Sequence, residues 1–225
     1  GMGRVELDEY LNYIEEQGIP TKQENGNNYA EVNGKIYEIV IENGELKIEY
    51  VEEGEITEPR IQEIKIIEQT LESIEIKVTA VRMEGGTYTY YIGTSEEQLE
   101  EDGANQTGEY TFEGLTQGET YYIKVEGENQ EGLKTEKIIE IKLDAIPQGE
   151  GNIEYEIRWS LGVATVELTT ESVYTIEYST DNSQYIAGTR VTGLRSGDTI
   201  YARLTDGIYS GKEIKIDIID STKPE

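Results

Sequence analysis

Hydrophobic and polar positions near the N-terminus follow the period of an α-helix. The apolar residues have the three- and four-residue spacing of one helix face: Leu7, Tyr10, Leu11 and Ile14. The acids between them are expected to face away from that side: Asp8, Glu9, Glu15 and Glu16. Gly18 stands where a glycine commonly ends a helix, and Pro20 prevents the helix from resuming. The pattern predicts one amphipathic helix of about three turns.

The pattern then changes to alternation of apolar and polar residues. The stretch EVNGKIYEIVIENGELKIEY, Glu31 to Tyr50, contains two Asn-Gly pairs between alternating segments. Asn-Gly favours two-residue hairpin turns, because both central positions need a positive φ. We expect strands at Tyr29 to Val32, Lys35 to Ile41 and Glu45 to Val51. Residues 1–57 are therefore predicted to form a helix on a three-stranded β-meander.

Two further segments contain only strand patterns. The acidic stretch EEGEITEP precedes the first of them, residues 58–145, and DAIPQGEGN precedes the second, residues 149–220; both stretches are predicted to be linkers. Short strands separated by turn signals at this density are typical of β-sandwiches. Residues 221–225 are polar and contain a proline, so we expect them to begin a linker to a further domain.

The predicted fold is mainly β, with a small α+β N-terminal unit followed by two immunoglobulin-like β-sandwiches in tandem. A weak internal repeat relates the two sandwiches. GLTQGETYYIKVEG, Gly114 to Gly127, and GLRSGDTIYARLTDG, Gly193 to Gly207, each place Gly-Leu, a second glycine, an acid and a threonine before a tyrosine-bearing strand. Tandem copies of one β module are typical of elongated stalks.

Composition narrows the function classes. The chain has 47 acidic and 19 basic residues and a formal net charge of −28. The electrostatic field of this negative charge repels nucleic-acid phosphates and anionic lipid headgroups. We therefore expect no nucleic-acid partner and no membrane contact by this part of the protein. The expected partner is an unidentified protein or glycan at the cell surface.

The absence of cysteine and histidine excludes much of enzyme chemistry. Ser-His-Asp and Cys-His triads, histidine-ligated zinc and a histidine general base all need a residue type that this chain lacks. We expect a protein that is not an enzyme and has no cofactor. No apolar stretch approaches the ~20 residues of a transmembrane helix. The start of the chain reads like a tag remnant, so we expect any leader or anchor to lie outside this sequence, with an extracellular, bacterial cell-surface location.

The middle segment resembles a fibronectin type III domain at Leu115, Gly118 and Tyr121. In that family a Leu-x-Pro-Gly-x-x-Tyr motif precedes a strand, and its tyrosine forms the tyrosine corner. Gln117 stands at the proline position here. The resemblance implies that the Tyr121 hydroxyl bonds a backbone carbonyl at the junction of the sheets. The family's buried tryptophan is missing; Ile74, Ile76 and Val78 occupy its neighbourhood.

Two looser resemblances concern the other segments. The last one is similar to bacterial immunoglobulin-like repeats of surface proteins, in YTIEYSTDNSQY from Tyr174 to Tyr185, in GDTIYARLTDG and in the exit DSTKPE. The first resembles the globular start of a type IV pilin-like or pseudopilin-like protein. Its hydrophobic helical half, the part that defines that family, is not present in this sequence. Together these resemblances imply a Gram-positive cell-surface protein.

Four tyrosines are the best candidates for a recognition surface: Tyr88, Tyr90, Tyr91 and Tyr122. Tyrosine offers a large contact area at little entropy cost, and its ring stacks on sugars or peptides. In the alternative interpretation, Tyr88 and Tyr90 share one strand face with Ile92 and line the core. Trp159 closes a run of apolar residues of one parity, so core packing is the simpler interpretation for it than a glycan platform.

Three aspartates fall in predicted turns of the last segment and could hold calcium through hard oxygen ligands: Asp181, Asp198 and Asp206. They lack the spacing of a calcium loop, and Asp181 is equally consistent with an Asx turn.

The predicted function is that of a non-enzymatic extracellular structural or adhesion protein, a stalk or pilus-like surface component that projects further domains. The alternative is a set of accessory carbohydrate-binding or spacer modules of a secreted polysaccharide-active enzyme.

Overall fold

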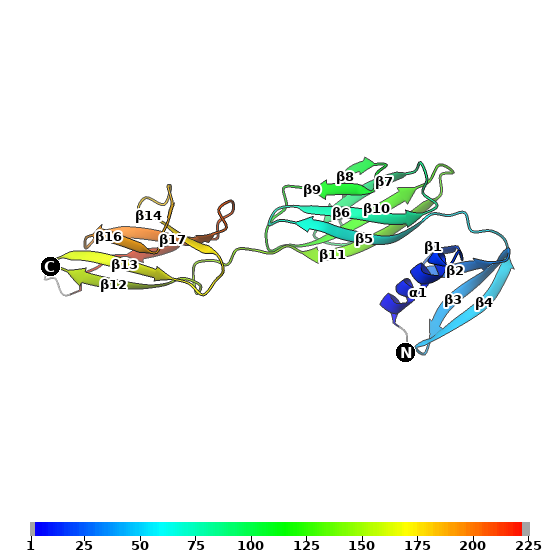
Figure 1. The fold of residues 1–225 in the computed structure, drawn as a ribbon, viewed down its shortest axis with the longest axis horizontal. Helices are drawn as coiled ribbons and strands as arrows, with labels where there is room; N and C mark the ends of the chain where they lie inside the picture. Colours follow the sequence, from blue (N-terminus) through cyan, green and yellow to red (C-terminus); the bar gives the residue numbers. More distant parts are fainter. Residues whose placement is uncertain (1–2, 222–225) are drawn as a thin grey trace. The chain divides into compact units, whose positions relative to one another are not determined.

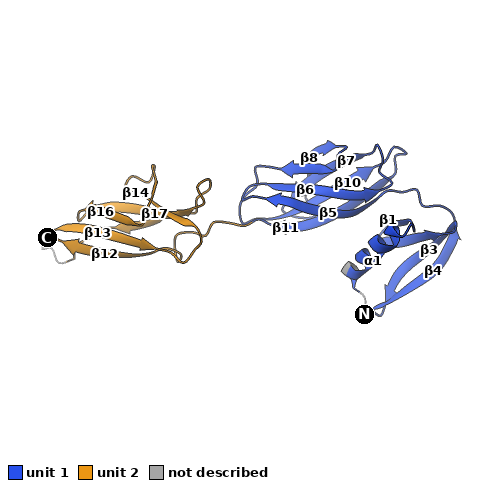
Figure 2. Cartoon of the chain, in the orientation of Figure 1, with its two compact units in different colours: residues 1–143 blue, residues 144–225 orange. Residues whose placement is uncertain are grey.

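The computed structural model describes residues 3–221 and divides the chain into two compact units, residues 1–143 and 144–225 (Figures 1 and 2). The first unit contains the helix, the meander and a β-sandwich; the second contains another β-sandwich. The predicted fold class is confirmed: the chain is mainly β, with one N-terminal helix and two immunoglobulin-like sandwiches in tandem. The division of the first unit at residue 57 remains a prediction.

The N-terminal part is one helix on a four-stranded antiparallel meander. The helix α1 spans Arg4–Glu16, and Gly18 beyond its end has a φ of 86°. The strands follow in sheet order: β1 (Thr21–Glu24), β2 (Asn27–Val32), β3 (Lys35–Glu42) and β4 (Glu45–Glu53). The sequence predicted three of these strands and missed β1. In the described part of the chain, α1 is too short and too polar to cross a bilayer.

Each hairpin of the meander turns on an Asn-Gly pair. The asparagines Asn25, Asn33 and Asn43 have φ values of 52°, 51° and 54°, and the glycine after each of them has a φ between 75° and 81°. These conformations match the type I′ turn, whose twist suits the flanking strands. The turn at Asn25 is the one that the sequence analysis did not use, and it is the turn that adds β1 to the sheet.

The helix packs on the meander through its predicted apolar face. Leu7, Leu11 and Ile14 are buried against Ala30 and Ile39 of the sheet. Tyr10, Ile41 and Leu46 pack at the margin of this cluster and are half-buried. The small size of the cluster indicates that this part gains further stability from its contacts with the adjoining sandwich.

The first sandwich consists of two antiparallel sheets (Figure 1). One sheet has the order β5-β6-β9, with bounds Arg60–Gln69, Ile74–Val81 and Glu109–Phe112. The other has the order β11-β10-β7-β8, with bounds Lys134–Lys142, Thr120–Glu128, Thr87–Gly93 and Glu100–Asn105. Ile74, Ile76 and Val78 of β6 are buried in the core of this sandwich. The core between the sheets adds an aromatic group: Tyr88, Tyr90 and Phe112.

The second sandwich repeats the same strand order. Its three-stranded sheet is β12-β13-β16, with bounds Glu154–Ser160, Val163–Thr169 and Arg190–Leu194. Its four-stranded sheet is β15-β14-β17-β18, with bounds Ile186–Ala187, Thr175–Ser179, Thr199–Thr205 and Ile214–Asp217. Counted from the first strand of each sandwich, the strands take identical places, the arrangement expected of one duplicated module.

The two predicted linkers are packed rather than free. In the acidic stretch, Ile56 is 4% exposed, and its N–H donates to the Glu31 carboxylate at 2.8 Å. In the second stretch, Ile146 is 5% exposed, and the Gly149 N–H donates to the Lys212 carbonyl at 2.8 Å. Composition indicated flexibility here, but one buried isoleucine anchors each segment. The predicted exit linker falls almost entirely on residues 222–225, outside the described residues.

Candidate functional site

The four candidate tyrosines lie on opposite faces of one sheet. Tyr88 and Tyr90 are 8% and 0% exposed and belong to the core of the first sandwich. The Tyr90 hydroxyl donates to Asn105 Oδ1 at 2.7 Å, and its ring stacks on that of Tyr110 with centroids 4.3 Å apart. Burial raises the pKa of Tyr90 above its ordinary value. The expectation of a recognition surface therefore needs correction for these two residues, because alternation along β7 turns them inward.

Tyr91 and Tyr122 are half-buried on the outer face. Tyr91 lies opposite Lys124 of β10 in the regular pairing of β7 with β10. The Lys124 Nζ lies 4.4 Å from the centroid of the Tyr91 ring, within the range of a cation–π contact. One face of that ring is therefore already in contact with a cation of the same chain. A ligand that stacks on this ring would have to displace Lys124.

The three candidate calcium ligands lie in separate turns, and each accepts hydrogen bonds from its own turn. Asp181 Oδ1 accepts from the Ser183 N–H at 2.8 Å, and Asp206 Oδ1 accepts from the Tyr209 N–H at 2.7 Å. Backbone donors of this kind lower the pKa of both carboxyls; for Asp181 the largest contribution comes from Gln184. Asp198 Oδ2 accepts from the Arg195 N–H at 2.7 Å.

Within residues 3–221, no three acidic, histidine or cysteine side chains come together as a metal site. The geometry therefore explains Asp181, Asp198 and Asp206 as turn residues.

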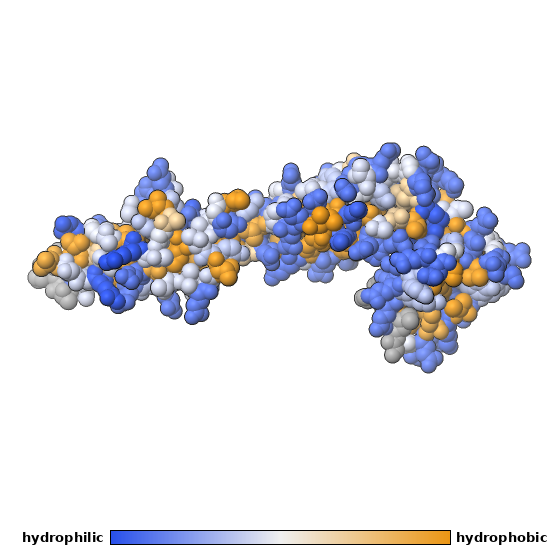
Figure 3. All heavy atoms as spheres, viewed as in Figure 1, coloured by the Kyte–Doolittle hydropathy of each residue, from blue (hydrophilic) through white to orange (hydrophobic). Residues whose placement is uncertain are grey.

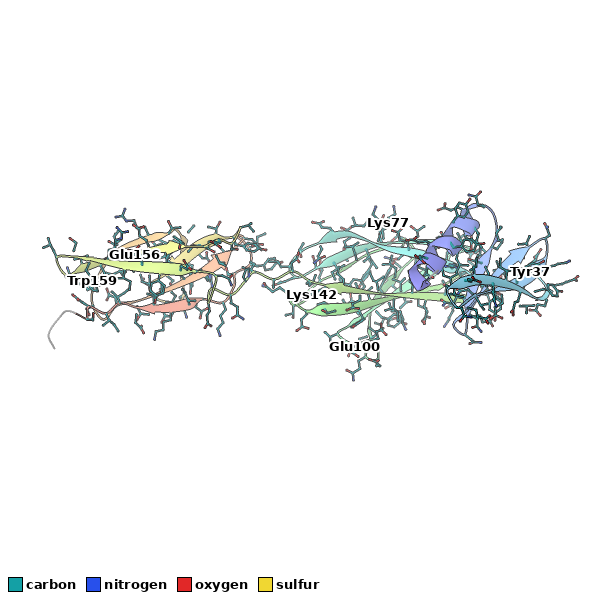
Figure 4. All side chains as sticks on the ribbon, turned by 90° about the horizontal axis from the view of Figure 1, so that it is seen from below. Tyr37, Lys77, Glu100, Lys142, Glu156 and Trp159 are labelled. Atoms are coloured by element: carbon teal, nitrogen blue, oxygen red, sulfur yellow. The ribbon has the colours of Figure 1, made fainter. Side chains whose placement is uncertain are left out.

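Trp159 is half-buried at the end of β12, an edge strand (Figure 4). The apolar run that it closes is not uniformly buried, because Tyr155 in the same strand is 51% exposed. The first strand of this sandwich thus covers the core less completely than its parity suggested.

The predicted tyrosine corner forms a different hydrogen bond from the one that the resemblance implied. The Tyr121 hydroxyl accepts from the backbone N–H of Thr116 at 2.8 Å, so its partner is an amide rather than a carbonyl. Gly118 takes a φ of 80° in the same turn, and Leu115 packs on the core. These residues fix the turn that leads into β10 and have a structural role.

A site that the sequence analysis did not find lies between α1 and the first sandwich. Its central residue is Arg82, which follows β6 and has a φ of 55°. The Arg82 guanidinium bonds the Glu15 carboxylate, with Nη1 to Oε1 at 2.6 Å. It also donates to the Thr21 carbonyl at 2.5 Å and to the Glu58 carbonyl at 2.7 Å. One side chain thus contacts the helix, the meander and the segment that joins them to the sandwich.

Glu15 is the acceptor at the centre of this network. Its side chain is only 5% exposed, although the helix pattern assigned it to the outward face. Besides Arg82, it accepts from the N–H and the hydroxyl of Thr21 at 2.8 and 2.7 Å. Because both carboxylate oxygens have donors, the buried charge of Glu15 is compensated. Removal of Arg82 would leave this buried charge without its ionic partner.

Arg60 adds a second guanidinium to the network. It is 8% exposed, and its Nη1 donates to the Thr21 hydroxyl at 2.8 Å. Burial lowers the pKa of Arg60, while the nearby carboxylates of Asp8 and Glu15 act in the opposite direction. We name the four residues Glu15, Thr21, Arg60 and Arg82 the arginine joint.

Two contacts flank the arginine joint. Lys22 Nζ lies 3.2 Å from the Glu58 carboxylate, and Asn12 donates to the Gln62 carbonyl at 3.1 Å. Burial acts to lower the pKa of Lys22, but its hydrogen bonds to Glu24 and Glu58 outweigh that effect and raise the value. Polar, directional bonds therefore hold the meander and the sandwich together at several points.

A cavity of about 780 Å³ lies beside the arginine joint. Its lining mixes both charges, with Asp8 and Glu126 near Arg60 and Lys134. Lys134 is 3.5 Å from Glu126, so these two charges neutralise each other. The cavity has no set of groups of one sign that would select a charged ligand, and its chemistry is that of a solvated seam.

Comparison with protein-family models finds no match, and neither does comparison with curated proteins. Similar solved structures include fibronectin type III domains. The domain from human fibronectin type III domain containing protein 3 has 17% identity and a TM-score of 0.33, over 41% of this chain and 87% of that one. A two-domain segment of chicken tenascin has 14% identity and a TM-score of 0.31, over 70% of this chain and 97% of that one.

The central fibronectin III array of RIM-binding protein has 14% identity and a TM-score of 0.29, over 76% of this chain and 73% of that one. Scores of this size carry no functional argument. The immunoglobulin-like character of both sandwiches rests on their own strand order and cores.

Proposed function

We propose that this chain is a non-enzymatic extracellular spacer, a stalk segment of a cell-surface protein. The observation that supports this most directly is the arginine joint. The Glu15 side chain is 5% exposed and bonded to Arg82, and breaking such a pair is costly, so this contact holds the meander on the sandwich. The repeated sandwich and the acidic surface fit the same role, because net charge discourages self-association.

The proposed role is mechanical: the chain holds its parts in a fixed arrangement. Arg82 crosslinks α1, β1 and the joining segment through bonds of 2.5 to 2.7 Å. The chain between them is short and anchored by buried Ile56, so little slack remains. A bacterial source and the pilin-like character of the N-terminal part remain predictions.

The test is a distance measurement across the arginine joint. Because the chain has no cysteine, Glu9→Cys and Lys77→Cys give one spin-label pair on exposed positions of α1 and β6. We expect a narrow distance distribution in the full chain. Arg82→Met should broaden it and lower the stability of the first unit by about 3 kcal/mol, since it leaves the Glu15 carboxylate buried and unpaired.

The matched control is Arg158→Met, which removes an exposed arginine of the second sandwich paired only across the surface with Glu156. It should change neither quantity. A broad distribution in the unsubstituted protein would refute the rigid spacer.

The accessory glycan-binding alternative rests on Tyr91 and Tyr122, the two candidate tyrosines on the outer face. A glycan array with the full chain separates the two functions. Reproducible binding that Tyr91→Ala and Tyr122→Ala abolish would favour the carbohydrate module.

A further inference from the structure

The face of the meander that packs on α1 extends beyond the helix. Tyr37, Ile39 and Ile41 of β3 pair directly with Tyr50, Ile48 and Leu46 of β4. Directly paired residues point to the same side of a sheet. Ile39 is 3% exposed beneath the helix, whereas its partner Ile48 is 56% exposed. The helix therefore covers the sheet only as far as β3 and the beginning of β4.

The uncovered part forms an apolar strip. Tyr50 is also 56% exposed, and its ring meets that of Tyr37 edge to face with centroids 5.8 Å apart (Figure 4 labels Tyr37). Ile48, the residue of β4 between Leu46 and Tyr50 on this face, is exposed to the same extent. Figure 3 shows hydrophobic atoms at the surface of this part of the molecule, surrounded by hydrophilic ones. We name Tyr37, Ile48 and Tyr50 the tyrosine strip.

The strip borders an open sheet edge. In the described part of the chain, β4 pairs with β3 alone and is the last strand of its sheet. Its backbone groups on the far side therefore have no strand partner. Such an edge is a template for an added strand unless something protects it. A register shift near Val51 disturbs the end of β4, which leaves Glu45 to Tyr50 as a straight run.

Acidic side chains protect this edge against pairing with other acidic strands, but not against pairing with basic ones. β4 contains four glutamates: Glu45, Glu49, Glu52 and Glu53. Its single lysine, Lys47, is 3.0 Å from the Glu42 carboxylate and is thus neutralised. An acidic edge on a chain with a net charge of −28 repels a second copy of the same chain. It does not repel a strand of opposite charge.

We infer that the edge of β4 takes an extended, lysine- or arginine-rich segment of a partner protein as a fifth strand. The partner's backbone pairs with Glu45 to Tyr50. Alternate apolar side chains lie on Ile48 and Tyr50, and the basic side chains between them meet the glutamates. This interaction goes beyond the spacer role and does not depend on it.

The test uses a peptide of eight residues that alternates lysine with valine and has blocked ends. Binding to the full chain is followed by fluorescence anisotropy, and the site is located by hydrogen exchange of the β4 amides. We expect saturable binding, slower exchange within Glu45 to Tyr50, and an affinity that falls at least tenfold between low and high salt. Ile48→Lys with Tyr50→Lys should lower the affinity at least tenfold. Both positions are exposed, so the variant should keep its fold, as circular dichroism would verify.

Two controls make the result specific. Tyr155→Lys alters an equally exposed tyrosine on the edge strand β12 and should leave binding unchanged. A peptide with glutamate in place of lysine should not bind. Equal binding of both peptides, equal loss in Tyr155→Lys, or no binding at millimolar peptide would each overturn the inference. Dimerisation of the free chain that Ile48→Lys abolishes would overturn it too, in favour of a second copy as the occupant.

Discussion

The turn that leads into β10 of the first sandwich and the turn that leads into β17 of the second have the same backbone but different side chains. Gly114 and Gly193 have φ values of 70° and 74° at equivalent places. In the first turn, the Tyr121 hydroxyl accepts the Thr116 N–H; in the second, the Asp198 carboxylate accepts the equivalent N–H of Arg195.

In the second sandwich, Ile200 occupies the position equivalent to Tyr121, and it is fully buried. The backbone donor must be satisfied, but the side chain that satisfies it can change.

The cores of the two sandwiches likewise combine the same strand arrangement with different side chains. Tyr90 and Phe112 are fully buried in the first sandwich, and Tyr110 packs on both rings at 4.3 and 4.9 Å. The corresponding interior of the second sandwich is aliphatic, with Leu168, Ile200, Leu204, Ile216 and Ile218 among its most buried residues. The same strand order is thus compatible with a partly aromatic core and with an aliphatic core. Alternation of apolar and polar residues specifies the topology in both sandwiches, whereas different core side chains stabilise each one.

The largest expected effect comes from removal of one large core side chain in each sandwich. Phe112→Ala should lower the free energy of unfolding of the first by about 3 to 5 kcal/mol, and Leu204→Ala that of the second by about 2 to 5 kcal/mol. Calorimetry should show each substitution moving one transition and leaving the other in place. Movement of both transitions by either substitution would mean that the sandwiches unfold together.

The next effect is alkaline loss of stability in the first sandwich. Burial raises the pKa of Tyr90, and burial together with the bond to Asp102 raises the pKa of Tyr110 to about 12. Both values lie above the ordinary ~10, so the folded state holds these protons more tightly than the unfolded state. The contribution is complete below pH ~10 and is lost as the pH rises toward 12.

Urea unfolding at pH 8 and pH 11 measures this loss. The first sandwich should weaken at pH 11, and a variant with Tyr90→Phe and Tyr110→Phe should lose most of that pH dependence. A second sandwich that weakens more than the first over this range would contradict the assignment.

The smallest effect concerns the two turns. Tyr121→Phe and Asp198→Ala each remove one acceptor, and each should lower the stability of its own sandwich by about 1 kcal/mol. Thr116 and Arg195 would keep a backbone N–H that only water can then satisfy. Chemical denaturation of the single variants checks this, and no change in either would show that solvent already serves these amides.

The strands that the sequence predicted are those with strong alternation. β6, β10 and β17 of the sandwiches show this alternation, because apolar residues of one parity must face the core. The sequence missed three strands. One of them, β15 (Ile186–Ala187), is only two residues long, and the other two are polar. β1 (TKQE) and β8 (EEDGAN) have no apolar alternation and exist because a neighbour supplies their hydrogen bonds, β2 to one and β7 to the other.

The arginine joint could not be predicted from local pattern. Arg82 and Glu15 are 67 positions apart in the chain. Glu15 lies on the flank of a helix whose Glu6, Glu9 and Glu16 are exposed, and nothing near it in sequence marks it as buried. Tyr91 shows the converse: parity placed it correctly outside the core, but its contact with Lys124 depends on strand pairing.

The Asn-Gly turns of the meander restrict which of its positions can change during evolution to give a new binding specificity. Each reversal uses two residues with left-handed backbone, so an insertion or a β-branched replacement would break the hairpin rather than lengthen a loop. Antibody-like sandwiches diversify at loops of variable length. The hairpins of the meander have no loops of variable length. A new binding specificity would therefore have to come from substitutions of side chains on the strands themselves.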